Sequence, residues 1–410
     1  MIKKAVLFTS VFIVFALVIS MVVTFQAAIY TVATRIADQF PASGGAPTPI
    51  ASADLTDAGP GSLVAATTMP GVTRTYEGRG LHAARVVYRS TSGDSGEPTV
   101  VSGSVFTPPG DAPQGGWPVV AFGHGTLGIE NPCAPSLDPS LLGLMRYVRV
   151  LTKLGYAVAL TDYQGLGTKG IHPYSDSRTA GLNMIDAVRA LKRTFPDVSD
   201  SWAAFGDSQG GSAAWAADEQ ASTYAPELKL VGALAASPAA DIAGLVDKAQ
   251  QGTLTTEQRP VMQSVVESLA RLHPDLDRND YRRGAAAHYW NVLSDCSPSA
   301  AYRRATASQQ LGARDFAPRT PEAADRLRTL LQAWALPQEP LSAPLYVFYG
   351  GKDPFIESKW TADALQRACA LGGVVTIEFD PEGGHNPANA LNMIGWMGER
   401  FKGEPVQNDC

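Results

Sequence analysis

A serine at position 208 stands in a sequence pattern that is typical of nucleophilic serines. Residues 206–210, Gly-Asp-Ser-Gln-Gly, fit G-x-S-x-G, with an apolar run before them at 202–205 and an alanine-rich run after them at 212–217. A strand, a tight turn and a helix in this order expose the hydroxyl at a helix N-terminus, where an oxyanion is stabilised. The chain has 39 glycines, so the motif alone is weak. The flanking strand and helix are what favour a nucleophile over an ordinary glycine-rich turn.

A serine hydroxyl is a poor nucleophile at neutral pH, so Ser208 needs a nearby base and a carboxylate that orients the base. With an elbow of this kind, the order along the chain is serine, acid, histidine. His385 fits this order, because it follows the last predicted strand on a loop that begins Gly383-Gly384. The other histidines precede the serine or lie in a long helical stretch: His82, His124, His172, His273 and His288.

Three carboxylates compete for the role of the orienting acid. Asp353 comes directly after the predicted strand 345–349, so it too is expected at the carboxyl end of a strand, where the sites of open α/β sheets lie. Asp380 and Glu382 are nearer to His385 in sequence, but they share its loop and would have to fold back to reach the imidazole. We therefore predict a triad of Ser208, Asp353 and His385.

Acyl transfer also requires donors that stabilise an oxyanion. One donor is expected to be the backbone N–H of Gln209, the residue after the nucleophile. The other is expected from the loop that follows strand 117–122, where Thr126 is favoured and Leu127 is the alternative. In the same loop His124 is expected to orient the backbone. Asp162 ends another strand and is expected to fix a loop rather than to line a pocket.

These residues require a framework of alternating strands and helices. Apolar and β-branched runs predict strands at 81–89, 99–106, 117–122, 156–160, 202–205, 230–235, 345–349 and 374–379. Helical spacing separates most of them, as in 141–154, 182–191 and 358–371. The pattern predicts an α/β protein of the α/β-hydrolase fold, with a mostly parallel sheet that helices cover on both faces.

The alternation is interrupted at 240–336, where no strand is predicted and amphipathic stripes recur. We predict a helical cap there, inserted into a core formed by 69–239 and 337–410. Tyr289, Trp290 and Leu331 are candidates to line an apolar acyl pocket under the cap. The alternative is a structural subdomain without a role in binding.

The N-terminus predicts export. Ala5 to Val23 is a run of 19 residues without charge after Lys3-Lys4, so 1–38 is read as a signal sequence or a membrane anchor. Either role places the remaining chain outside the cytoplasm. Residues 39–68 are rich in Pro, Gly, Ala and Ser and are read as a spacer.

The amino-acid composition limits the kinds of molecule that this protein is expected to bind. The 410 residues are 45% hydrophobic, carry a net charge of −6 and show no basic stripe, so no nucleic-acid partner is expected. The four cysteines are widely spaced and form no C-x-x-C. No metal and no cofactor are therefore expected, and two disulfides in an oxidising compartment are favoured over free buried thiols.

The chain resembles the secretory lipase family of α/β-hydrolases from about residue 70 to its end. The resemblance rests on LGYAV at 154–158 before Asp162, IDAVRALK at 185–192, the elbow, YAPEL at 224–228 with VGA at 231–233, and CAPS at 133–136. It implies the same triad, a helical cap over the site, and disulfides Cys133–Cys296 and Cys369–Cys410.

The resemblance implies a hydrolase of carboxylic esters, with lipid or other acyl esters as substrates. An esterase or amidase for short acyl groups or cell-envelope polymers is the enzymatic alternative. A membrane-tethered binding module on an inactive hydrolase fold is the alternative from another class. Membrane contact is expected through the N-terminal apolar segment if that segment is not cleaved.

Overall fold

The computed structural model describes residues 45–388 and 390–410. The predicted signal or anchor lies outside the described residues. Within them, no helix has the length and apolar character needed to cross a membrane.

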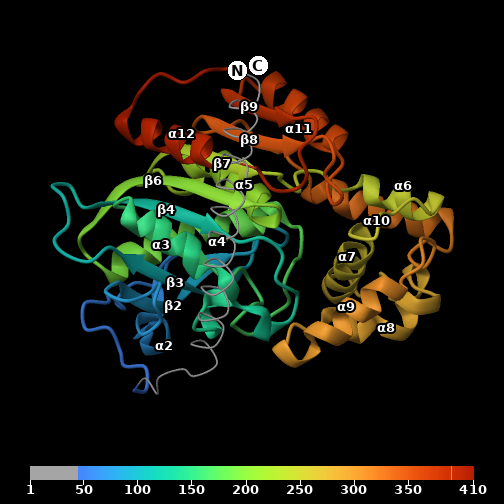
Figure 1. Ribbon diagram of the computed structural model, residues 1–410, viewed down its shortest axis with the longest axis horizontal. Coiled ribbons are helices and arrows are strands. Elements are labelled where there is room, and N and C mark those ends of the chain that lie inside the picture. Colours follow the sequence, from blue (N-terminus) through green and yellow to red (C-terminus); the bar gives the residue numbers. More distant parts are fainter. Residues whose placement is uncertain (1–44, 389) are drawn as a thin grey trace, which may run out of the picture.

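A nine-stranded sheet forms the centre of the molecule (Figure 1), with strand order β1-β2-β3-β5-β4-β6-β7-β8-β9. Strands β4 to β9 run parallel, while β1, β2 and β3 form an antiparallel edge joined to β5. The strands are Leu63–Thr68, His82–Thr91, Pro98–Thr107, Trp117–Gly123, Ala157–Thr161, Val198–Asp207, Lys229–Ala236, Leu345–Gly350 and Val375–Asp380. The predicted α/β-hydrolase architecture is confirmed.

Helices cover both faces of this sheet because each carries one apolar side. Helices α4 (Ser177–Thr194), α5 (Gln209–Tyr224) and α11 (Ser358–Ala370) pack on one face, around Trp202 and Trp215. The other face is covered by α2 (Pro70–Thr73), α3 (Met145–Lys153) and α12 (Leu391–Lys402). The central strands are therefore buried on both sides, which explains their continuous apolar runs.

The structure corrects the boundary of the predicted spacer. Residues 63–68, assigned to the spacer, form β1 and pair antiparallel with β2. Leu63 and Ala66 are buried, whereas the sequence Leu-Val-Ala-Ala-Thr-Thr has no clear period. Its extended form therefore depends on the partner strand, which local sequence does not reveal.

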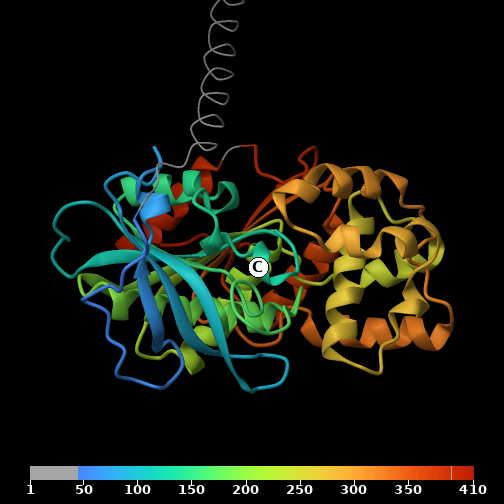
Figure 2. The same ribbon diagram turned by 90° about the horizontal axis from the view of Figure 1, so that it is seen from below.

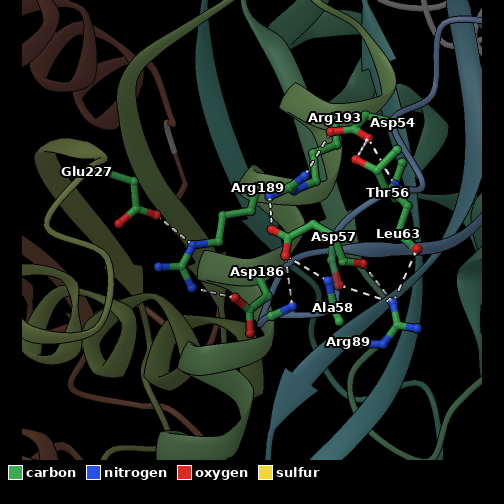
Figure 3. Close-up of polar contacts among 12 residues, drawn as sticks. Asp54, Thr56, Asp57, Ala58, Leu63, Arg89, Asp186, Arg189, Arg193 and Glu227 are labelled. Carbon is green, nitrogen blue, oxygen red and sulfur yellow. Dashed lines mark hydrogen bonds and ion pairs between the residues drawn. The ribbon is translucent and has the colours of Figure 1, made fainter.

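The segment before β1 is held on the core by polar contacts at the end of α4 (Figure 3). Arg193 pairs with Asp54 at 3.0 Å and also with Asp57. Arg89 of β2 donates to the Leu63 carbonyl at 3.3 Å. The spacer composition thus does not prevent residues 50–62 from lying against the folded body.

Residues 240–336 contain only helices and short 3₁₀ turns, gathered on one side of the molecule in Figure 1 and Figure 2. The α-helices are α6 (Gly244–Gln251), α7 (Gln258–Leu272), α8 (Gly284–Ser294), α9 (Ala301–Gln310) and α10 (Pro321–Trp334). They enclose an apolar core separate from those on the sheet. A disulfide between Cys133 and Cys296 links this cap to a core loop, and Cys369–Cys410 links α11 to the C-terminus.

Candidate active site

Ser208 lies at a sharp turn between β6 and α5. Its backbone has φ 55° and ψ −117°, a strained conformation for a residue with a side chain. The turn is possible because its neighbours are glycines: a Cβ on Gly206 would lie 2.1 Å from the Gly210 carbonyl oxygen. The serine therefore stands at the N-terminus of a 16-residue helix, on the wall of a cavity.

His385 and Asp353 meet beside this cavity. Asp353 follows β8 and His385 follows β9, and the neighbouring parallel strands bring the two residues together. His385 Nδ1 donates to Asp353 Oδ2 at 2.7 Å. Asp353 Oδ1 accepts the backbone N–H groups of Phe355 and Ile356, at 2.8 and 3.1 Å. These bonds fix the position of the Asp353 carboxylate. Because Asp353 binds Nδ1 of His385, the other ring nitrogen, Nε2, remains for the reaction.

The rival acids have other partners. Asp380 Oδ1 accepts the backbone N–H of Glu382, and Glu382 forms an ion pair with Lys352. Ser208 and His385 both line the cavity, which measures about 620 Å³. The remaining five histidines do not line it. The structure thus places Asp353 in contact with His385, and Ser208 and His385 on the wall of one cavity. The catalytic triad itself stays a prediction.

The loop after β4 forms another wall of the cavity. Gly125, Thr126 and Leu127 all line it. The Thr126 hydroxyl is 2.9 Å from the Tyr174 hydroxyl, so this side chain is tied to the loop that follows β5. Gln209 is the first residue of α5, and its backbone N–H has no partner within the helix. The backbone N–H of Gln209 and one from Thr126 or Leu127 stay the predicted donors to an oxyanion.

Two buried histidines support these walls in the neutral form. Burial lowers the pKa of His124, whose Nδ1 donates to the Gly125 carbonyl at 2.7 Å. Burial also lowers the pKa of His172 to about 4. His172 Nδ1 donates to the Gln164 carbonyl at 2.9 Å, so its Nε2 accepts from the Gln209 side chain at 3.0 Å. His124 thus holds the loop as predicted from its position, and His172 holds Gln209.

Asp162 lies behind the site rather than in it. It accepts hydrogen bonds from the Ser102 hydroxyl and the Ser136 backbone N–H, at 2.6 and 2.9 Å. Burial raises its pKa, and these donors oppose that rise. It does not line the cavity, which agrees with the loop-fixing role.

Two residues of the site are not identified as functional candidates by the sequence pattern. Asp207 lines the cavity, and a Cβ on Gly125 would lie 2.9 Å from its Oδ2. Burial raises the pKa of the Asp207 carboxyl, while His124 and His385 act in the opposite direction. The other residue is His172, which the chain order disfavours because it precedes the serine. The elbow motif could have pointed to Asp207, but nothing local marks His172, which reaches the site through its loop.

The cap residues that line the cavity are not the ones that the sequence predicts. Val261 and Ser264 of α7 and Leu293 of α8 line the cavity. Tyr289, Trp290 and Leu331 do not line it. Trp290 is only 2% exposed, and its indole N–H donates to Glu267 at 2.7 Å inside the cap. The acyl-pocket prediction for these side chains is wrong, because the amphipathic stripes bury their apolar sides against one another.

Among residues 45–388 and 390–410, no group of three or more His, Cys, Asp or Glu side chains could hold a metal ion. The cavity wall includes the Ser208 hydroxyl at the turn and the His385 imidazole, a pair suited to acyl transfer.

Solved structures of hydrolases share this fold. Lipase A of Candida antarctica in its closed state matches with a TM-score of 0.69 and 17% identity, covering 88% of this chain and 87% of that one. The rice cell wall degrading esterase LipA of Xanthomonas oryzae, in a ligand-bound form, matches with a TM-score of 0.63 and 18% identity, covering 84% and 97%. At these identities the likeness shows the fold alone.

Sequence comparison is more specific. A Mycobacterium tuberculosis protein named "probable inactive lipase" is 26% identical over 352 residues, which cover 79% of this chain and 74% of the relative. The family model described as secretory lipase matches residues 143–409, a range that contains Ser208, Asp353 and His385. The chain belongs to the secretory lipase family.

Proposed function

We propose that this chain is an exported serine hydrolase that cleaves carboxylic esters through Ser208, His385 and Asp353. The observation that carries the proposal is the 2.7 Å contact of His385 with Asp353 beside a cavity that Ser208 also lines. Membership of a secretory family and two disulfides support export.

In the proposed reaction Ser208 Oγ attacks the acyl carbon while His385 Nε2 accepts its proton. Asp353 holds the imidazole in the tautomer that has its hydrogen on Nδ1 and stabilises the imidazolium. The Gln209 backbone N–H and a donor from the loop after β4 stabilise the oxyanion. His385 then protonates the leaving alcohol, and a water molecule releases the acyl group by the same route.

The cavity supports esters with an apolar acyl group. Its walls include Leu144, Val261, Leu293 and Phe355, so an acyl chain of several carbons has apolar side chains to contact. Its size also admits a short acyl group. We therefore propose lipid or other acyl esters as substrates, with a short-chain or cell-envelope esterase as the enzymatic alternative.

A second candidate function is binding without catalysis. The name of the Mycobacterium tuberculosis relative favours it. The contact of His385 with Asp353 and the strained turn at Ser208 favour catalysis here, because an idle site has no need to retain either.

The test uses the purified full chain, a fluorophosphonate probe, and aryl esters of graded acyl length. We expect one equivalent of probe on Ser208 and hydrolysis of at least one ester. Ser208→Ala should abolish both. Ser212→Ala is the matched control, because Ser212 lies one helical turn further along α5 and its hydroxyl donates to the Gln209 carbonyl at 2.9 Å.

Full labelling of Ser208→Ala would identify another serine as the nucleophile. A folded parent protein that neither labels nor hydrolyses any ester would support the binding function instead. Circular dichroism of parent and variant establishes that both are folded.

A further inference from the structure

Helix α3 presents a basic and apolar surface to solvent. Between Met145 and Lys153 the sequence is Met-Arg-Tyr-Val-Arg-Val-Leu-Thr-Lys, with three cations and no carboxylate. Large apolar side chains on or directly after this helix are exposed: Tyr147 by 40%, Val150 by 46% and Leu154 by 51%. We call Arg146, Tyr147, Arg149, Val150, Lys153 and Leu154 the α3 face.

The two kinds of side chain are sorted around the helix. Met145, Val148 and Leu151 are buried against the core and α12. At 100° per residue, the exposed apolar positions and the cations form two adjacent stripes, which share the side of the helix away from the core. This is the distribution of a helix that lies in the plane of a membrane interface, where apolar side chains enter the headgroup region and cations contact lipid phosphates.

The loop after α2 extends this surface. Arg149 donates to the Arg79 carbonyl at 3.3 Å, which places the loop beside α3. Arg79 in this loop is exposed, and the nearby Glu77 is half-buried. Cations and aromatic rings at one surface suit the interface of a bilayer, because each has an apolar body and a polar end.

The α3 face adjoins the catalytic cavity. Leu142, Leu144, Arg146 and Tyr147 line that cavity, and the helix continues from them along the surface. A flat lipid surface that contacts the α3 face would therefore lie at the edge of the cavity.

The first described residues lie beside the end of β1. The Thr48 backbone N–H donates to the Thr68 hydroxyl at 2.9 Å, and Thr68 directly precedes Met69 and α2. Met69 packs with the buried residues of α3.

We propose that the α3 face docks on a lipid bilayer that contains anionic lipids. Charge selects this occupant, since cations without neighbouring carboxylates on the helix attract an anionic surface. The same charges would repel a second copy of the chain placed face to face. Docking goes beyond ester hydrolysis and does not require it.

The test attaches an environment-sensitive fluorophore to one added thiol in the full chain, since all four native cysteines are paired. Val150→Cys reports on the α3 face. Leu371→Cys is the matched control, because Leu371 is 45% exposed at the end of α11, on the opposite side of the sheet. Vesicles of phosphatidylcholine alone or with phosphatidylglycerol are added to each labelled protein.

We expect a blue shift and an intensity gain at position 150, but not at 371, with the anionic vesicles. Arg149→Gln combined with Lys153→Gln should weaken the docking equilibrium about 30-fold, since each cation near an anionic surface contributes about fivefold. Lys229→Gln with Lys359→Gln removes two charges elsewhere and should have little effect. Salt at about 1 M should weaken docking. Ser208→Ala should dock like the parent, which separates docking from catalysis.

Equal signals at 150 and 371 would overturn the proposal, because the body would then have no preferred face. A response to neutral vesicles as strong as the response to anionic ones would overturn it as well. A shift at 150 that grows with protein concentration in the absence of vesicles would identify a second copy as the occupant instead.

Discussion

The α/β core and the helical cap contribute to the cavity in different ways. The core supplies Ser208, Asp353 and His385 at the ends of strands, where the backbone fixes each position. The cap supplies Val261, Leu293 and other wall residues from helices that pack on a core of their own. The positions of residues at strand ends are determined by the sheet. The positions of the cap residues that line the cavity are determined by how one helix packs on another.

Several polar contacts and one disulfide join the two regions. Cys133–Cys296 and the ion pair between Glu130 and Arg271 link a core loop to the cap. Within the core, Glu219 of α5 accepts the backbone N–H groups of Gln338 and Glu339, where the chain returns from the cap to the sheet. The comparison implies that core changes should affect the reaction itself, and that cap changes should affect substrate range or stability.

The largest effect is expected in the core. His385→Ala should lower kcat by roughly 10⁶-fold and Asp353→Asn by about 10⁴-fold, because they remove the base and its orientation. The double variant should be little slower than His385→Ala, since triad members act as a unit. Turnover of an aryl acetate measures this. Losses that multiply independently would show that one of the two does not belong to the triad.

A large but different effect is expected in the interior of the cap. Trp290→Ala should destabilise the protein by about 3–5 kcal/mol, because it removes a buried ring and one of the donors to Glu267. Urea unfolding gives this value, and Tyr302→Ala, at an 83% exposed cap residue, is the control. Specific activity per folded molecule should fall equally for all acyl lengths. A selective loss of long esters would mean that Trp290 contacts substrate.

The contact of Glu219 with the core segment that follows the cap should make stability depend on pH. Burial raises the pKa of Glu219 to about 7, so the folded protein holds this proton more tightly than the unfolded chain. The free energy of unfolding should therefore fall as pH rises from about 4.5 to 7, by about 3 kcal/mol from this group.

Glu219→Gln keeps an acceptor oxygen but removes the titrating carboxyl. The free energy of unfolding of this variant should therefore decrease less as pH rises. Burial also raises the pKa values of Asp176 and Asp186 to about 6, so part of the slope should remain. Urea midpoints at pH 4.5 and 7.5 test this, with exposed Glu404→Gln as the control. An unchanged slope would mean that Glu219 titrates normally in the folded protein.

The smallest effect is expected at the cap wall. Leu293→Ala removes apolar surface that faces the cavity, and one buried methylene is worth about 0.8 kcal/mol, or about fourfold. We expect kcat/KM for long acyl esters to fall severalfold to tenfold and that for acetyl esters to change little. Leu276→Ala, buried in the cap but absent from the cavity wall, is the matched control. An equal loss of kcat/KM for all acyl lengths would mean that Leu293 supports the structure of the cap and does not contact the acyl chain.

Local patterns are sufficient for the core because its signals are strong. The central strands have apolar runs, and G-x-S-x-G between a strand and a helix has few structural interpretations. The β1 strand escapes prediction because its extended form depends on pairing with β2. The pattern assigns the cap wall to the wrong residues because a helical stripe identifies a buried side without identifying its partner.

The sequence by itself determined the order of strands and helices, the elbow at Ser208, and the identity of the residues at the strand ends. Those features depend on residues close together in the chain. The tertiary structure decided that His172 reaches Gln209, that Asp207 faces the loop at Gly125, and that Trp290 turns into the cap. These contacts join residues that are far apart in sequence or depend on side-chain packing, so their geometry exists only when the sheet and the cap have formed.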